Sequence, residues 1–225
     1  DEALAEKYLG VTEQYLMMYE EMIGAFPYTK FALVENFWET GYGMPSFTLL
    51  GEKIIRFPFI LHSSYPHELL HNWWGNSVYI DFDKGNWCEG ITAYMADHLI
   101  KEQRGQSEIY RREVLQKYSN FVNEANDFPL DAFISRHDGI SESVGYGKGL
   151  MFWHMLRLKI GDKAFTKGFA LFYERFKFKT ASYRDIQNCM QEVSGENLEA
   201  FFQQWLQRIG APMLKLETDT LVKHG

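Results

Sequence analysis

Hydrophobic and polar residues follow two different periodicities along this chain. In the first 24 positions apolar residues recur every three or four residues, which predicts an amphipathic helix over residues 2–24. Between residues 30 and 59 the pattern changes to short β-branched and aromatic runs, FALVENFW, SFTLL and KIIRF, with a glycine-rich segment at 41–45 between the first two. These runs predict a small β-sheet.

Helical spacing returns after residue 63 and continues to residue 206. The expected helices cover residues 66–74, 89–103, 107–123, 148–160, 162–176, 183–193 and 197–206. A group of strands followed by a group of helices, with no internal repeat, predicts an α+β fold in one domain. We expect a helix plus a small sheet in residues 1–62 and a helical subdomain in 63–210. Residues 211–225 alternate like a strand, so a following β module and further flanking domains are expected in the parent protein.

The composition excludes several classes of protein. The 225 residues are 46% hydrophobic, enough for a sizeable core, and carry a net charge of -7 without a basic cluster. Nucleic acid is therefore not an expected partner. No apolar stretch approaches the roughly 20 residues that a transmembrane helix needs, so no membrane span is expected in this chain. The two cysteines, Cys88 and Cys189, predict buried free thiols and no disulfide framework.

The strongest chemical signal is the segment HELLH at residues 67–71. His67 and His71 are four residues apart, so on a helix they lie about 40° from each other and both imidazoles can reach one ion. Pro66 suits the first turn of that helix, and Ser63 or Ser64 is expected to cap it. Glu68 lies beside the metal position and is predicted to be the general base that takes a proton from water.

A catalytic zinc ion takes three protein ligands and leaves one position for water. Glu89 is the expected third ligand, because it begins the next predicted helix after a loop rich in Asp and Gly. Asp81 and Asp83 are rival carboxylates, although loop aspartates usually face solvent. The sequence therefore predicts one Zn²⁺ per chain.

These residues resemble the membrane alanyl aminopeptidase family, a group of thermolysin-like gluzincin zinc metallopeptidases. The resemblance rests on HELLHNWWGN at 67–76, the Glu-Gly pair at 89–90, the segment YGKG at 146–149, and closing helices in 194–214. It implies that residues 1–225 form a single gluzincin catalytic domain. It also implies a small mixed β-sheet lobe beside a mainly α-helical lobe with zinc in the cleft, and a peptide substrate cleaved by an aminopeptidase-like reaction.

The resemblance also implies roles for individual residues. Tyr146 would stabilise the oxyanion of the tetrahedral intermediate, although a packed core tyrosine is the alternative interpretation. The family's Gly-x-Met-Glu-Asn segment, whose glutamate binds the free amino terminus of the substrate, corresponds to residues 41–46. Pro45 follows the methionine there, so Glu35 or Glu39 is the candidate for supplying that carboxylate.

The glycine-rich segment is a candidate for substrate binding. Gly41, Tyr42, Gly43 and Met44 could form a backbone edge that pairs with an extended substrate, or else a plain tight turn. Asp97 is a candidate for orienting one of the histidines.

Three functions agree with this sequence. The first is zinc-dependent hydrolysis of peptide bonds at amino-terminal or internal positions. The second is metal-dependent hydrolysis of another substrate, and the third is a non-catalytic peptide-binding module. The presence of a base and a full ligand set together favours catalysis.

Overall fold

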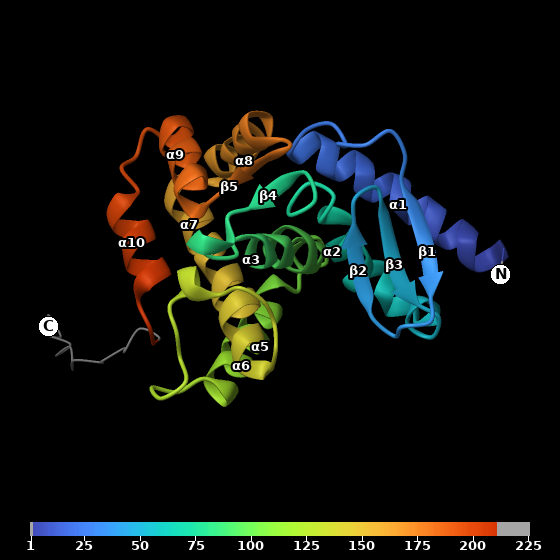
Figure 1. Cartoon of the computed structure of the whole chain (residues 1–225), viewed down its shortest axis with the longest axis horizontal. Helices are drawn as coiled ribbons and strands as arrows, with labels where there is room; N and C mark the ends of the chain where they lie inside the picture. The colour runs from blue at the N-terminus through green and yellow to red at the C-terminus, as the bar shows by residue number, and fades with distance from the viewer. Residues whose placement is uncertain (1, 211–225) are drawn as a thin grey trace, which may run out of the picture.

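Two lobes are visible in the computed structural model, which describes residues 2–210 (Figure 1). The smaller lobe contains helix α1 (Glu2–Met22) and a three-stranded sheet, and the larger lobe is built mainly from helices. The predicted α+β class, with a small mixed sheet beside a helical lobe, is confirmed. The strand pattern expected near the end of the chain, within 211–225, lies outside the described residues.

The three-stranded sheet has the order β1-β3-β2, with β1 at Ala32–Asn36, β2 at Gly41–Met44 and β3 at Phe47–Gly51. Strand β1 pairs with β3 in parallel, whereas β2 pairs with β3 antiparallel, so the sheet is mixed. The glycine-rich segment is thus itself an edge strand. The short turn after it depends on Ser46, whose φ of 70° is supported by a 2.9 Å hydrogen bond from its backbone N–H to Asn72 Oδ1.

The prediction of a strand at KIIRF is wrong. Residues Ile54–Arg56 form a short 3-10 helix, η1, because the sheet pairing stops at β3 and the backbone turns there. Glu39 stabilises this turn, since its Oε2 accepts hydrogen bonds from the backbone N–H groups of Lys53 at 3.0 Å and Ile54 at 3.3 Å.

The larger lobe follows the expected order of helices with small shifts at their ends. The described α-helices are α2 (Ser64–Leu70), α3 (Cys88–Thr92), α4 (Leu99–Gln103), α5 (Ser107–Phe121), α6 (Gly139–Glu142), α7 (Gly149–Ile160), α8 (Asp162–Phe176), α9 (Tyr183–Ser194) and α10 (Glu199–Gln207). Helix α2 is shorter than predicted because the chain turns at Trp73 and Trp74 into strand β4 (Val78–Ile80). Strand β4 pairs in parallel with β5 (Lys179–Ala181), and neither strand was predicted.

Two segments of π-helix interrupt the helical lobe. Segment η4 (Ala93–His98) joins α3 to α4, and η6 (Ser143–Lys148) joins α6 to α7, so each forms the middle of a longer helix. A π turn inserts residues without ending the helix and changes which side chains share a face. Both segments pack at the centre of the lobe, next to α7.

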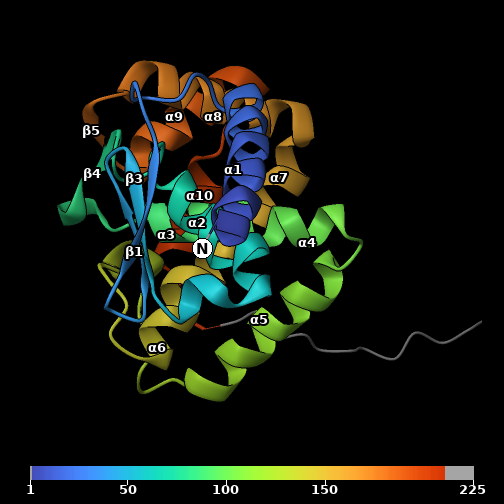
Figure 2. The same cartoon turned by 90° about the vertical axis from the view of Figure 1, so that its right-hand side faces the viewer.

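One buried core extends from α1 to α10. It contains Trp73, Trp74 and Trp87, all fully buried. The core also joins the two lobes, since Trp73 Nε1 donates to the carbonyl of Gly24 at 2.9 Å. In the view of Figure 2, α1 stands between the sheet and α4.

Cys88 and Cys189 are buried free thiols, as expected. Among residues 2–210, no helix combines the length and the apolarity that crossing a bilayer would require.

Candidate metal centre

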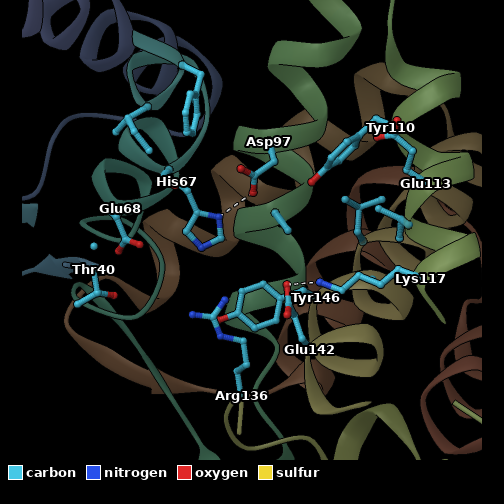
Figure 3. A pocket seen from close by; sticks show the side chains of 18 of the residues that line it. Thr40, His67, Glu68, Asp97, Tyr110, Glu113, Lys117, Arg136, Glu142 and Tyr146 are labelled. Atoms are coloured by element: carbon cyan, nitrogen blue, oxygen red, sulfur yellow. Dashed lines mark hydrogen bonds and ion pairs between the residues drawn. The ribbon is translucent and has the colours of Figure 1, made fainter. Parts of the chain in front are cut away.

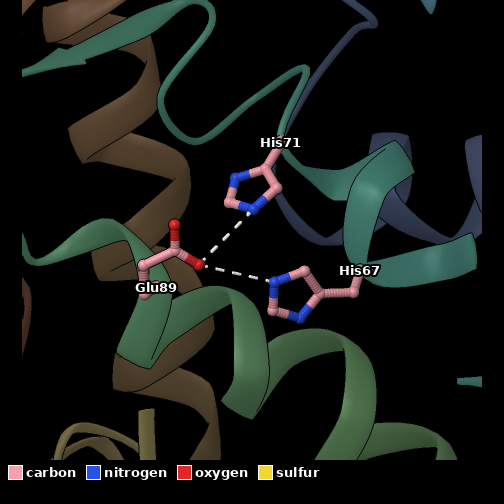
Figure 4. Close-up of side chains that lie close together, drawn as sticks. All are labelled: His67, His71 and Glu89. Carbon is pink, nitrogen blue, oxygen red and sulfur yellow. Dashed lines mark ion pairs between the residues drawn. The ribbon is translucent and has the colours of Figure 1, made fainter. Parts of the chain in front are cut away.

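The three predicted metal ligands converge at the junction of helices α2 and α3 (Figure 4). His67 and His71 lie along α2 and at its carboxyl end, and Glu89 lies in the first turn of α3. Glu89 Oε2 is 3.5 Å from His67 Nε2 and 3.6 Å from His71 Nε2. The ligand atoms of all three residues lie within 4.8 Å of one another. Two nitrogens and one oxygen therefore surround a single position.

Each imidazole is held by its other nitrogen. His67 Nδ1 lies 2.7 Å from Asp97 Oδ2, and His71 Nδ1 lies 3.0 Å from the carbonyl oxygen of Trp74. Both partners are acceptors, so each ring donates a proton from Nδ1 and keeps the Nε2 lone pair free. The candidate partner Asp97 is therefore found next to His67, and both Nε2 atoms face Glu89.

The π turn explains how Asp97 reaches His67. Asp97 is eight positions after Glu89, and eight steps of regular α-helix would turn the two side chains about 80° apart. The wider turn of η4 brings Asp97 back to the side that faces α2. The same helix can thus supply one carboxylate to the ligand set and another to the histidine behind it.

The charge balance of the ligand set favours a cation. Glu89 Oε2 is buried and has no hydrogen-bond donor in contact with it. Burial opposes its charge, but the imidazoles of His67 and His71 prevail and lower the pKa of Glu89 to about 2. Burial also opposes protonation of His67, yet the carboxylates of Asp97, Glu89 and Glu68 raise its pKa well above the usual value. The acidic surroundings therefore attract positive charge to this position. A divalent ion bound there would supply this charge while both imidazoles stay neutral.

Glycines allow the elements around the ligand set to approach one another closely. A Cβ at Gly43 would lie 2.6 Å from both the backbone oxygen of Glu68 and His71 Cβ, and one at Gly41 would lie 3.1 Å from Glu68 Oε1. On α3, a Cβ at Gly90 would lie 2.9 Å from Gly149 Cα. Because the glycines of β2 have no side chain, helix α2 can pack directly against this strand. The Glu68 carboxylate then lies next to the strand.

Tyr146 lies across the ligand set from the sheet. Its ring is nearly parallel to that of His67, with centroids 6.1 Å apart and an interplanar angle of 12°. Burial and the Glu89 carboxylate raise the pKa of Tyr146, so the phenol stays protonated. Tyr146 lies within the π-helical segment η6, in the middle of a continuous helix.

The ligand set opens into a pocket of about 680 Å³ between the two lobes (Figure 3). Of the residues predicted from sequence, the pocket is lined by Glu39, Gly41, His67, Glu68, Asp97 and Tyr146. Tyr42, Gly43 and Met44 are not among its lining residues. Residues that sequence reasoning did not single out also line it, among them Tyr110, Glu113, Lys117, Arg136 and Glu142.

The other candidate carboxylates lie elsewhere. Glu35 forms an ion pair with Arg56 at 3.3 Å and does not line the pocket. Asp81 and Asp83 line a separate hollow beside α9 and α10. Of the candidate carboxylates for the third ligand, Glu89 is the one that joins the histidines.

Comparison with known proteins agrees with this geometry. Residues 62–205 match the peptidase family M1 domain. The chain is 28% identical over 171 residues to aminopeptidase N of Lactococcus lactis, covering 69% of this chain and 20% of that protein. It is 24% identical over 160 residues to the mitochondrial aminopeptidase 2 of Saccharomyces cerevisiae, covering 68% and 17%. The chain thus spans about a fifth of the length of these curated relatives.

Solved structures share the fold. An M1 zinc metallopeptidase from Deinococcus radiodurans superposes with a TM-score of 0.72 at 20% identity, over 94% of this chain and 46% of that one. Native yeast LTA4 hydrolase superposes with a TM-score of 0.69 at 20% identity, over 91% and 36%. Both similarities cover the smaller lobe as well as the helical lobe.

Proposed function

Since this chain belongs to peptidase family M1, we propose that it is the catalytic domain of a zinc-dependent peptidase. The proposal includes residues 1–62 and 63–210 as two parts of one domain, because a continuous core joins them. The observation that carries it is the convergence of His67, His71 and Glu89 on one position beside a pocket that contains an acidic residue and a phenol. Curated relatives that are named aminopeptidases make a peptide the expected substrate.

Zinc fits the donor set on structural grounds. Two imidazole nitrogens and one carboxylate oxygen are the ligands that catalytic zinc sites favour, and three of them leave one coordination position open. The hydrogen bonds from Nδ1 of each histidine leave the lone pair of Nε2 available. A bound zinc ion would polarise the scissile carbonyl and lower the pKa of a water molecule.

The protein residues around that position divide the acid-base work. Glu68 lines the pocket on the sheet side, where its carboxylate can accept the proton of the attacking water and deliver it to the leaving amine. Tyr146 lines the opposite side as a protonated phenol and can donate a hydrogen bond to the oxyanion. Asp97 keeps the His67 ring in one orientation.

Glu39 is the residue we propose to bind the free amino group of the substrate. Its carboxylate is fixed by the backbone N–H groups of Lys53 and Ile54, and the side chain lines the pocket on the sheet side. Gly41 and its neighbours in the edge strand β2 would offer backbone groups to the same end of an extended substrate. Glu35 does not suit this role because it pairs with Arg56 outside the pocket.

The test of the proposed reaction compares zinc-loaded protein with the Glu68→Gln variant on peptides with free and acetylated amino termini. We expect hydrolysis by the wild type and a loss of about 100-fold or more in Glu68→Gln, with zinc content unchanged. Full activity in Glu68→Gln would refute the assigned base. Absence of hydrolysis in the wild type despite bound zinc would favour a binding module.

The role of Glu39 has its own test. Glu39→Gln should lose the preference for free over acetylated amino termini, whereas the matched Glu35→Gln variant should keep it. Equal preference in Glu39→Gln and the wild type would count against Glu39. Efficient cleavage of acetylated peptides by the wild type would instead favour an endopeptidase.

A further inference from the structure

Most charged groups that line the pocket already have partners. The pocket carboxylates are Glu39, Glu68, Asp97, Glu113 and Glu142, and the pocket cations are Lys117 and Arg136. Lys117 Nζ lies 2.6 Å from Glu142 Oε1, so the charges of these two side chains compensate each other. Asp97 is bound to His67 and Glu39 to backbone amides.

Arg136 differs from Lys117. Its guanidinium carbon lies 5.6 Å from the ring centroid of Tyr146, and Figure 3 shows the group beside that ring, facing the open pocket. Among residues 2–210, no carboxylate forms an ion pair with Arg136. Asp138, two residues further along the chain, instead accepts a hydrogen bond from the backbone N–H of Ser141 at 2.8 Å. A guanidinium held against an aromatic face can still donate its N–H groups in the plane of the fork.

We propose that Arg136 binds a carboxylate of the substrate on the leaving-group side of the scissile bond. This inference rests on the proposed function and adds a substrate class to it, namely short peptides that carry a carboxylate close to the bond that is cleaved. The carboxylate is either the carboxyl terminus of a dipeptide or an acidic side chain at the same residue. Both present the planar pair of oxygens that a guanidinium fork matches with two parallel hydrogen bonds.

The position of Arg136 fixes which side of the bond it serves. The sheet side of the pocket carries Glu39 and Gly41, whereas Arg136 belongs to the segment between η5 (Leu130–Ala132) and α6 on the helical side. A substrate with its amino group at Glu39 and its scissile carbonyl between Glu68 and Tyr146 therefore extends its leaving part towards the helical side. Arg136, which has no ion-pair partner, lies on that side and can bind the leaving part of the substrate.

The acidic surroundings strengthen this assignment. Away from the proposed metal position, a pocket with five carboxylates and two cations repels an anionic substrate group except next to an unpaired positive charge. Lys117 is neutralised by Glu142, so Arg136 is the pocket cation, within the described residues, that remains available. Arg136 therefore favours substrates that carry a carboxylate, and only where that carboxylate lies on the leaving-group side of the scissile bond.

The experiment compares three substrates by kcat/KM: alanyl-alanine, alanyl-alaninamide, and an amidated dipeptide with aspartate in the second position. The wild type should prefer at least one carboxylate substrate over alanyl-alaninamide by roughly tenfold, the usual effect of a hydrogen bond to a charged group. Arg136→Gln should reduce that ratio to near one, because the substituted side chain no longer carries the charge that distinguishes a carboxylate from an amide. Preference for alanyl-alanine indicates a terminal carboxylate, and preference for the aspartyl amide indicates an acidic side chain.

Arg112→Gln is the matched control, because Arg112 is an exposed arginine of α5 that does not line the pocket. This variant should keep the wild-type ratios. A wild-type enzyme without preference for either carboxylate substrate, or an Arg136→Gln enzyme with an unchanged ratio, overturns the proposal.

A binding measurement separates this proposal from the proposed function. In the Glu68→Gln background, calorimetry should show alanyl-alanine or the aspartyl amide binding roughly tenfold more tightly than alanyl-alaninamide, and the added Arg136→Gln change should remove the difference. If the wild type cleaves no peptide but this difference is present, the proposed hydrolysis fails and the carboxylate site stands. If cleavage occurs and the difference is absent, the carboxylate site fails alone.

Discussion

At the scale of single residues, the site depends on which atoms remain free after every hydrogen bond is formed. Asp97 and the Trp74 carbonyl each engage Nδ1 of one histidine, and this leaves both Nε2 atoms directed at Glu89. The proposed ligand atoms are therefore oriented by partners that are not themselves among the three proposed ligands. Such partners commonly change metal affinity by 10- to 100-fold.

Asp97→Asn should weaken zinc binding by about 10- to 100-fold without abolishing it, because the amide can still accept from Nδ1 but no longer carries charge. Competition for zinc with a chromophoric chelator measures this change. Asp83→Asn, which removes a carboxylate from a hollow away from the ligands, should bind zinc as the wild type does. An Asp97→Asn protein with unchanged affinity would show that the 2.7 Å contact has no effect on the metal.

Tyr146→Phe keeps the ring that lies parallel to His67 and removes only the hydroxyl. We expect kcat to fall by on the order of 100- to 1000-fold with a small change in KM, since the lost hydrogen bond forms chiefly in the transition state. Steady-state kinetics at matched zinc content measures both quantities. A variant whose KM rises while its kcat is unchanged would indicate that Tyr146 only binds the substrate.

At the scale of elements, the site is set by how closely strand β2 and helix α2 approach each other. Gly43 has no room for a side chain, because an added Cβ would meet both the Glu68 backbone and His71 at 2.6 Å. Neither neighbour is a flexible chain end that could move aside. A larger residue would therefore push the helix that carries both histidines away from the strand.

Gly43→Ala should lower the free energy of unfolding by about 1–3 kcal/mol and weaken zinc binding, since the methyl group displaces the backbone around His71. Gly10→Ala is the matched control on α1, where an added Cβ meets nothing within 4 Å. That change should stabilise the protein by up to about 1 kcal/mol, because alanine favours helix over glycine. Urea unfolding of the two variants compares them, and equal effects would contradict the close approach.

The elements also show what the sequence could and could not predict. The convergence of His67, His71 and Glu89 was predictable because local helical spacing and the helix that begins around Glu89 determine where these side chains point. The π turns of η4 and η6 could not be predicted from the sequence, because such a turn has no residue pattern of its own and depends on packing against α7.

Non-local contacts account for the remaining differences. Strands β4 and β5 are about 100 residues apart in sequence, so the residues around either strand do not indicate that the two pair. Residues 54–56 carry a β-branched pattern but form η1, because Glu39 binds the backbone amides that a further strand would need. Arg136 became a candidate only when the fold placed it beside Tyr146 without a carboxylate partner.

At the scale of the whole molecule, the same core that joins the lobes also encloses titratable groups. His98 is fully buried in it, stacks on Tyr94 with ring centroids 4.8 Å apart, and accepts a 2.7 Å hydrogen bond from Arg111 Nη1 to Nε2. Burial, helped by the Arg111 charge, lowers the pKa of His98 to about 4. The folded protein therefore keeps this imidazole neutral where the unfolded chain would protonate it.

Stability should fall on acidification as a consequence. Between the ordinary pKa of 6.5 and the folded value of about 4, the unfolded chain binds a proton that the folded chain does not. The contribution of His98 is thus complete above about pH 6.5 and is lost as the pH falls towards 4, by on the order of 3 kcal/mol. Urea unfolding at several pH values should show a shallower decline in His98→Asn than in the wild type. Parallel curves would contradict a buried neutral His98.

The central claim is that His67, His71 and Glu89 hold one zinc ion together, and zinc titration of purified protein tests it most directly. The account predicts one tightly bound zinc per chain in the wild type and a large loss of affinity in His71→Ala and in Glu89→Ala, with folding retained by circular dichroism. Zinc bound with unchanged stoichiometry and affinity in folded Glu89→Ala would contradict it.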